Sequence, residues 1–115
     1  MSPRSHKRAR SSQPHQAVVF AALGDDTRLA LVAKLVSGKS ASIAQLASGS
    51  PLSRQAITKH LRVLERAGVV HSVRSGRESQ FVLDPRPLHA MQHYLDRVSR
   101  QWDQALARLK SFVER

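Results

Sequence analysis

The sequence predicts a mainly α-helical fold with a small β-hairpin wing, the winged helix-turn-helix architecture. Three observations predict it. The spacing of apolar residues gives the order helix, helix, short helix, helix, hairpin, helix along 115 residues, a length that suits a single core. Residues 53–68 carry an apolar stripe and a basic stripe on opposite faces of one helix. Residues 53–77 contain six Lys and Arg against one Glu, so the predicted helix and hairpin share a basic surface.

The overall charge is that of a protein that binds a polyanion. Lys and Arg total 19 while Asp and Glu total 8, which gives a net charge of +11. Aromatic residues make up 4% of the chain, which disfavours the base-stacking platforms that bind single strands. The chain has no cysteine, which excludes disulfides and zinc–thiolate sites. A polyanion is therefore the expected partner.

The chain divides into three predicted segments. Residues 1–14 are polar and basic without periodicity, so we expect a disordered N-terminal arm. Residues 15–84 are expected to form the winged helix-turn-helix domain, and residues 85–115 a long C-terminal dimerisation helix. The longest apolar run, residues 17–23, is far shorter than the ~20 residues of a membrane span, so we expect a cytoplasmic protein without membrane association.

The first two predicted helices lie on either side of the residues GDD. The helix HQAVVFAAL is apolar nearly all round, which predicts burial on more than one side. Asp25 can cap a second helix that runs from residue 26 to about residue 36. The expected core face of this second helix consists of Leu29, Val32, Ala33 and Val36.

The helix-turn-helix itself follows from capping signals. Ser42 with Gln45 three residues on forms a capping box for the short helix IAQLAS. Ser53 is a suitable N-cap for the helix over 53–68, and Gly68 is placed to cap its C-terminal end. The apolar stripe of that helix consists of Ile57, Leu61, Leu64 and Gly68.

A change of period then predicts the wing. The runs VVHSVRS and SQFVL alternate with a period of about two and are separated by GRE, which predicts a hairpin with a glycine turn. Asp84 followed by Pro85 at the first helical position predicts the start of the long final helix.

The basic stripe on the helix after Ser53 predicts a DNA-recognition helix, because a short helix, a turn and a second helix with a basic outer face suit the major groove. Arg54 can pair with guanine O6 and N7, Gln55 with adenine N6 and N7, and the Thr58 methyl can meet a thymine methyl. Lys59 and Arg62 are expected to hold phosphates, and the hairpin arginines to follow the backbone or enter the minor groove. The predicted DNA-contacting residues are Ser53, Arg54, Gln55, Thr58, Lys59, Arg62, Arg74 and Arg77.

The final helix carries an unbroken heptad seam. From Leu88 to Phe112 the apolar residues alternate steps of three and four. At ~1.5 Å per residue this seam is about 36 Å long, more than a domain of this size can cover by itself. We expect its first turns to pack on the chain's own core, and its outer end to meet a second copy together with the first helix. The predicted dimerisation residues are Val18, Phe20, Leu95, Val98, Trp102, Ala105, Leu109 and Phe112.

Three stretches of the chain resemble the ArsR/SmtB family of small bacterial winged-helix regulators. They are ALGDDTRLALVAKL, SIAQLA and LSRQAITKHLRVLERAGVVHSVRSGRESQFVL, and the similarity covers about residues 16–84. Its most specific part is TKHLRVLERAGVV with the glycine-containing wing. The resemblance implies a homodimer that binds a palindromic operator and represses transcription, often of its own operon.

The family's metal sites have no complete counterpart in this sequence. Many relatives use a Cys-x-Cys-type site on the short third helix, where this chain has Ser42 and Ala44. Another family site uses Asp and His on the last helix, but Arg86 stands where the second ligand of an Asp-x-His pair would be expected. The remaining possible ligands are Asp84, His89, His93 and Asp96. We therefore expect no metal and no other cofactor.

Two further histidines are of interest. His60 flanks the apolar stripe of the recognition helix, where a structural hydrogen bond or a phosphate contact is expected. His71 on the first wing strand has no partner that the sequence identifies.

The leading hypothesis is a homodimeric, sequence-specific DNA-binding repressor that acts through helix 53–68 and wing 69–83, with an inducer that the sequence does not specify. One alternative is a nucleoid-type protein that coats DNA without a preferred site. Another is a winged-helix module whose basic face binds an acidic protein or RNA. The sequence shows no Ser-His-Asp grouping, no paired carboxylates and no phosphate-binding glycine loop, so an enzyme is not expected.

Overall fold

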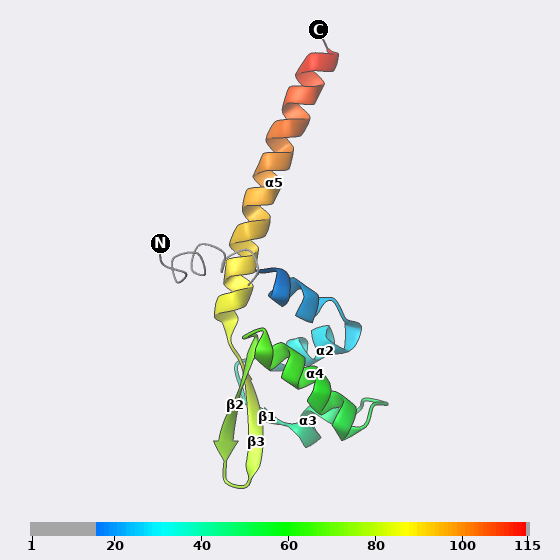
Figure 1. Cartoon of the computed structure of the whole chain (residues 1–115), viewed down its shortest axis with the longest axis vertical. Coiled ribbons are helices and arrows are strands. Elements are labelled where there is room, and N and C mark those ends of the chain that lie inside the picture. The colour runs from blue at the N-terminus through cyan, green and yellow to red at the C-terminus, as the bar shows by residue number, and fades with distance from the viewer. Residues whose placement is uncertain (1–15, 115) are drawn as a thin grey trace, which may run out of the picture.

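The computed structural model describes residues 16–114 and has the predicted order of elements (Figure 1). The predicted arm, residues 1–14, lies outside the described residues. Residues 16–23 are helical and lead into α2. The elements are α2 (Asp26–Leu35), β1 (Ala41–Ser42), α3 (Ile43–Ala47), α4 (Arg54–Arg66), β2 (Val70–Ser75), β3 (Glu78–Leu83) and α5 (Pro85–Val113). The winged helix-turn-helix prediction is confirmed, with β1 as an element that the sequence did not reveal.

The helices begin where their capping residues predict. The Asp25 carboxylate accepts a hydrogen bond from the Arg28 amide at 3.0 Å, which caps α2. Ser42 and Gln45 form the predicted capping box at α3. The Ser53 hydroxyl accepts from the Ala56 amide at 3.1 Å and so caps α4. These caps set where each helix starts, and therefore which side chains occupy the first turn of α4.

Gly68 ends α4 with the geometry that the sequence predicts. Its φ of +79° lies in the left-handed region, which favours glycine. Its amide donates to the carbonyl of Glu65 at 2.9 Å, and the Val69 amide donates to that of Leu64 at 3.0 Å, the Schellman pattern. This turn redirects the chain from the recognition helix straight into the wing.

The wing is a hairpin within a three-stranded antiparallel sheet of order β1-β3-β2. Ser75 pairs with Glu78 at the tip, and Gly76 in the turn has a φ of +63°. Two residues of β1 add to the other edge of β3, where Ala41 pairs with Phe81. A two-residue strand is too short to show a period of two, which is why the sequence did not predict it.

The core lies between the first helix, α2, α3, α4 and the base of the sheet. The predicted apolar stripe of α4 is buried at Ile57, Leu61 and Leu64, and Phe81 of β3 is fully buried. The remaining buried apolar residues are Val19, Ala22, Leu31, Val32, Leu35, Leu46, Ala67, Val69 and Val70. The prediction that the first helix is buried on more than one side is not met within a single chain, since Val18 is 48% exposed.

The prediction of the core face of α2 is wrong: the buried face lies about one residue earlier in the sequence than predicted. Leu31, Val32 and Leu35 are buried, whereas Leu29 is 49% and Val36 65% exposed. Apolar residues surround this helix on most sides, so their spacing alone does not define one face. The side that packs on the core carries Leu31 and Leu35, while Arg28 and the exposed Lys34 donate to backbone carbonyls of other segments.

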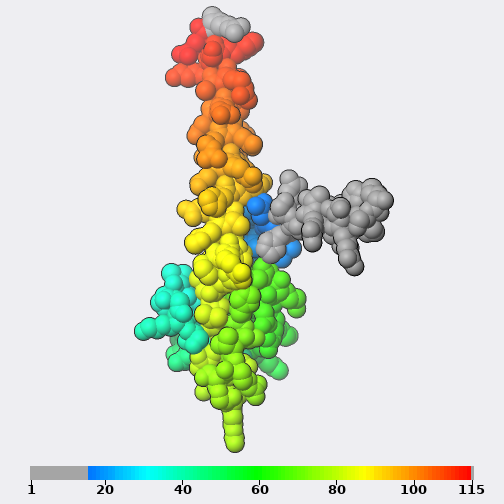
Figure 2. Space-filling model, turned by 90° about the vertical axis from the view of Figure 1, so that its left-hand side faces the viewer, coloured from blue at the N-terminus to red at the C-terminus, as the bar shows by residue number. Residues whose placement is uncertain are grey.

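Helix α5 leaves the domain after its first turns. Pro87 is buried, and Leu88 and Met91 pack against the core, as the sequence predicts for the start of the seam. The Phe20 ring of the first helix and the Tyr94 ring of α5 form a T-shaped contact, with 6.1 Å between ring centroids. Beyond that contact the outer half of α5 stands clear of the rest of the described chain (Figure 2). Within residues 16–114, no helix is both long and apolar enough to cross a bilayer.

Candidate nucleic-acid interface

The outer face of α4 presents the polar side chains of the predicted recognition stripe to solvent. Ser53, Arg54, Gln55, Lys59 and Arg62 are all exposed, and Thr58 is half-buried. Since the opposite face of α4 is fixed in the core, these side chains are held on one surface of a rigid helix. Figure 1 shows α4 and the hairpin in the same half of the molecule, away from the free end of α5.

The first turn of α4 lies close to the wing strand β3. Ser42, Ile43 and Ala44 at the start of α3 line a surface hollow together with Arg54, Glu78 and Ser79. The hollow therefore joins the N-terminal end of the recognition helix to the wing. Glu78 adds an acidic group to this surface, which the sequence-based assignment of basic residues did not take into account.

Arg62 connects the recognition helix to the wing. Its Nη1 lies 2.7 Å from Glu65 Oε1, and its guanidinium lies 5.8 Å from the centre of the Phe81 ring. The other Glu65 oxygen accepts a hydrogen bond from the Ser72 hydroxyl of β2 at 2.8 Å. The hydrogen bonds from Arg62 and Ser72 lower the pKa of Glu65. Arg62 thus has a structural role that the sequence did not indicate, and its predicted phosphate contact stays a prediction.

The Thr58 hydroxyl is used within the helix. Its Oγ1 donates to the carbonyl oxygen of Arg54 at 2.7 Å. The predicted contact with thymine uses the methyl group of Thr58, which this hydrogen bond does not involve.

The wing carries its two predicted arginines at exposed positions. Arg74 lies on β2, and Arg77 follows Gly76 in the turn. Arg74 pairs with Ser79 across the hairpin. The structure therefore presents both guanidinium groups on the wing, at positions separate from the stripe on α4.

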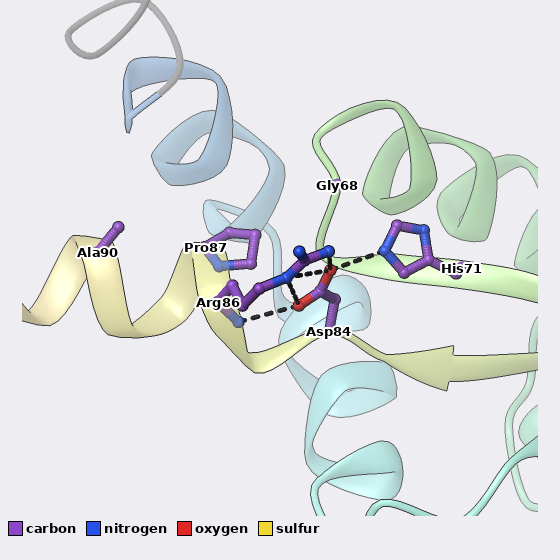
Figure 3. Close-up of a pocket in the computed structure, with 6 residues that line it drawn as sticks. All are labelled: Gly68, His71, Asp84, Arg86, Pro87 and Ala90. Atoms are coloured by element: carbon purple, nitrogen blue, oxygen red, sulfur yellow. Dashed lines mark hydrogen bonds and ion pairs between the residues drawn. The ribbon is translucent and has the colours of Figure 1, made fainter.

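A buried carboxylate fixes the base of the wing to α5 (Figure 3). The side chain of Asp84, 7% exposed, accepts hydrogen bonds from His71 Nε2 at 2.7 Å and from Arg86 Nη2 at 2.6 Å. The Arg86 guanidinium, followed by the His71 ring, holds the pKa of Asp84 well below its usual range. The sequence did not identify a partner for His71. The register of the hairpin could have identified this partner. Asp84 directly follows β3, and its amide donates a hydrogen bond to the carbonyl oxygen of Val69, two residues before His71.

The residues considered as metal ligands do not fit a metal. Arg86 donates to both oxygens of the Asp84 carboxylate, so a cation already occupies that group. Over residues 16–114 there is no group of three His, Cys, Asp or Glu side chains placed to hold a metal ion. His89 and His93 are exposed on α5, and no third ligand lies beside them in the described part of the chain.

The predicted dimerisation residues form a largely exposed apolar surface. Val18, Leu95, Trp102, Leu109 and Phe112 are exposed, Phe112 to 70%, while Phe20, Val98 and Ala105 are half-buried. Leu106 and Val113, which the sequence analysis did not assign, are also exposed on the outer part of α5. Surfaces of this kind mark contacts with another molecule.

Comparison with known proteins places this geometry in a family. Residues 12–73 match the family described as Helix-turn-helix domain. The chain is 37% identical over 93 residues to the HTH-type transcriptional regulator Rv2034 of Mycobacterium tuberculosis. The matched segment covers 81% of this chain and 83% of that protein.

Two solved structures extend the comparison. An ArsR-like transcriptional regulator from Rhodococcus sp. RHA1 is 38% identical, with a TM-score of 0.77 over 89% of this chain and 95% of its own. The transcriptional repressor BigR from Xylella fastidiosa is 25% identical, with a TM-score of 0.57 over 80% of this chain and 88% of its own. The chain belongs to the ArsR-like family of winged helix-turn-helix transcriptional regulators.

Proposed function

We propose that this regulator is a homodimer that binds a palindromic operator in double-stranded DNA and represses transcription. One observation carries the proposal: the same chain exposes a polar, basic recognition helix with an arginine-bearing wing and, on α5, a long apolar surface. The first surface suits the grooves of DNA, and the second suits another copy of the chain. A two-fold dimer would use both at once.

The proposed dimer contact combines α5 with the first helix. The large apolar side chains of the outer α5 are each about half exposed or more in the single chain, and burying one such side chain contributes about 1.5–3 kcal/mol. The first helix contacts α5 through Phe20 and Tyr94, and its Val18 is exposed and would take part in the contact. A two-fold axis through this surface would make the contact self-complementary and leave the wings free.

The proposed DNA contacts follow from chemistry. In the first turn of α4, Arg54 and Gln55 would read base edges, because their side chains can make two parallel hydrogen bonds to guanine and adenine. Lys59 and Arg62 would hold phosphates, as would Arg74 and Arg77 on the wing. Two recognition helices about one DNA turn apart, ~34 Å, would then read two half-sites.

Repression would follow from occupation of the operator. The relative BigR is described as a transcriptional repressor, which supports the same direction of regulation here. The protein would act where the chromosome lies, in the cytoplasm. No metal or cofactor is part of this proposal, and the inducing signal is left open.

Selection from random duplex DNA tests the proposal. The purified full chain is incubated at ~150 mM salt, where the Debye length is about 8 Å, and the bound sequences are read. We expect an inverted repeat with half-sites about one helical turn apart. A pool without sequence preference would instead favour non-specific DNA coating or binding of an acidic protein or RNA, because phosphate attraction alone does not discriminate among sequences.

A further inference from the structure

One arginine joins three helices at a single point. Arg28 lies in the first turn of α2, where its amide donates to the Asp25 carboxylate. Its guanidinium Nε donates to the carbonyl oxygen of Ala22 at 2.5 Å, in the last turn of the first helix. Its Nη1 lies 3.1 Å from Nδ1 of His60, on α4. The side chain therefore connects the first helix, α2 and the recognition helix.

The contact constrains the chemical state of His60. A guanidinium group has five N–H donors, no acceptor, and remains charged at all relevant pH values. The lone pair of His60 Nδ1 must therefore accept the hydrogen bond, which requires a neutral ring with its proton on Nε2. A protonated ring would place an N–H group against the Arg28 N–H and bring two cations within 3.1 Å of each other.

We propose that His60 is a positioning residue for DNA recognition: as a neutral acceptor for Arg28, it fixes α4 relative to the first helix. The inference rests on the proposed function, because the first helix belongs to the proposed dimer surface and α4 to the proposed DNA surface. Two recognition helices match the spacing of two half-sites only if each is held at a fixed position relative to the dimer contact. Protonation of His60 would break this link between α4 and the first helix and weaken operator binding.

The charged groups around His60 define how the contact would be lost. Asp25 Oδ2 lies 3.8 Å from Nδ1 and would attract a protonated ring, whereas Arg28 repels it. On its own helix, the neighbouring cations Lys59 and Arg62 are exposed, and Arg62 is paired with Glu65. A protonated His60 would therefore exchange Arg28 for Asp25, and the link to the first helix would break. Histidine is the side chain that changes charge between about pH 5 and 8.

The variant His60→Asn separates positioning from titration. The amide oxygen of asparagine can occupy a place close to that of Nδ1 and accept from Arg28, but it does not change charge. The matched control is His89→Asn, which removes an exposed histidine of α5. Affinity of the full chain for the selected inverted repeat is measured for the three proteins at about pH 7.5 and about pH 5.5.

We expect wild type and His60→Asn to bind equally well near pH 7.5. Near pH 5.5 the wild type should be weaker than His60→Asn by on the order of tenfold, the effect of losing one hydrogen bond to a charged group. His89→Asn should behave as the wild type. Equal binding by the two proteins near pH 5.5 would overturn the inference. Stronger binding by the wild type near pH 5.5 would also overturn it, because a charged His60 would then contact phosphate.

A second measurement does not depend on DNA. The ¹⁵N chemical shifts of the His60 ring near pH 7.5 should report a proton on Nε2 in the wild type, and a proton on Nδ1 would overturn the inference.

Failure of the proposed function and failure of the positioning role give different results. A lack of any sequence preference near pH 7.5 would reject the proposed function together with the role of His60 in it. A clear preference without a pH difference between wild type and His60→Asn would reject the positioning role alone.

Discussion

Arg62 and Glu65 form an ion pair of 2.7 Å on α4, and Glu65 extends it to Ser72 of the wing. The pair is partly exposed, so its contribution to stability is small, roughly 0–1 kcal/mol. Its importance lies in its position, because it connects the recognition helix to the strand that leads to the wing tip. The orientation of the wing relative to α4 therefore depends on a side chain that also faces the proposed DNA surface.

Replacing Arg62 with Ala should have two effects. Binding to every duplex should weaken alike, because a phosphate contact is lost. Amide exchange in β2 should also speed up, because Arg62 no longer holds the Glu65 carboxylate in place for its hydrogen bond with Ser72. Affinities for operator and scrambled duplex, with hydrogen exchange of the free protein, check this. Arg66→Ala, one turn further along α4, is the control. A change of sequence preference in Arg62→Ala would show that Arg62 reads a base.

Replacing Gln55 with Ala should relax specificity at one base position of each half-site. The expected loss of discrimination is about 1–3 kcal/mol at that position, the value of a bidentate contact. Competition among duplexes that differ at single positions measures it. An unchanged preference profile would reject base reading by Gln55.

Replacing Arg77 with Ala should weaken binding to all sequences and reduce the slope of log affinity against log salt by about 1. Titrations at several salt concentrations, with operator and scrambled duplex side by side, measure the slope. If only operator binding falls, the wing reads sequence in the minor groove.

Replacing Asp84 with Asn should destabilise the protein at neutral pH. Asparagine can still cap α5, so the change isolates the negative charge that His71 and Arg86 surround. Because folding lowers the pKa of this carboxyl, its contribution is fully present above its unfolded value of about 3.9 and is lost as the pH falls further. Thermal unfolding measured at neutral pH and then at decreasing pH below about 3.9 checks this. The difference in Tm between the two proteins should be full at neutral pH and should shrink progressively as the pH falls. A constant difference would contradict the assignment.

Replacing Leu109 with Glu should give monomers if the outer part of α5 is the dimer contact. A charge in a desolvated apolar contact is strongly unfavourable without a partner. Gln104→Glu adds the same charge at an exposed position on the same helix and should leave the oligomeric state unchanged. Light scattering distinguishes the two, and a dimer that survives Leu109→Glu would place the contact elsewhere.

The sequence predicts those features that depend on near neighbours in the chain. Capping by Ser42 and Ser53, the glycine that ends α4 and the proline that begins α5 are all local, and each appears at its predicted residue. Features that depend on tertiary contacts were missed. The face of α2 is decided by its packing against the other elements of the core, and the partner of His71 by strand register. Neither can be read from a period of apolar residues.

In the proposed complex, two chains read one operator together. Analytical ultracentrifugation of the full chain, free and bound to the selected duplex, tests this. We predict a free dimer and a complex of two chains on one duplex, with no stable complex of a single chain. A free monomer that binds one chain per duplex would contradict the claim.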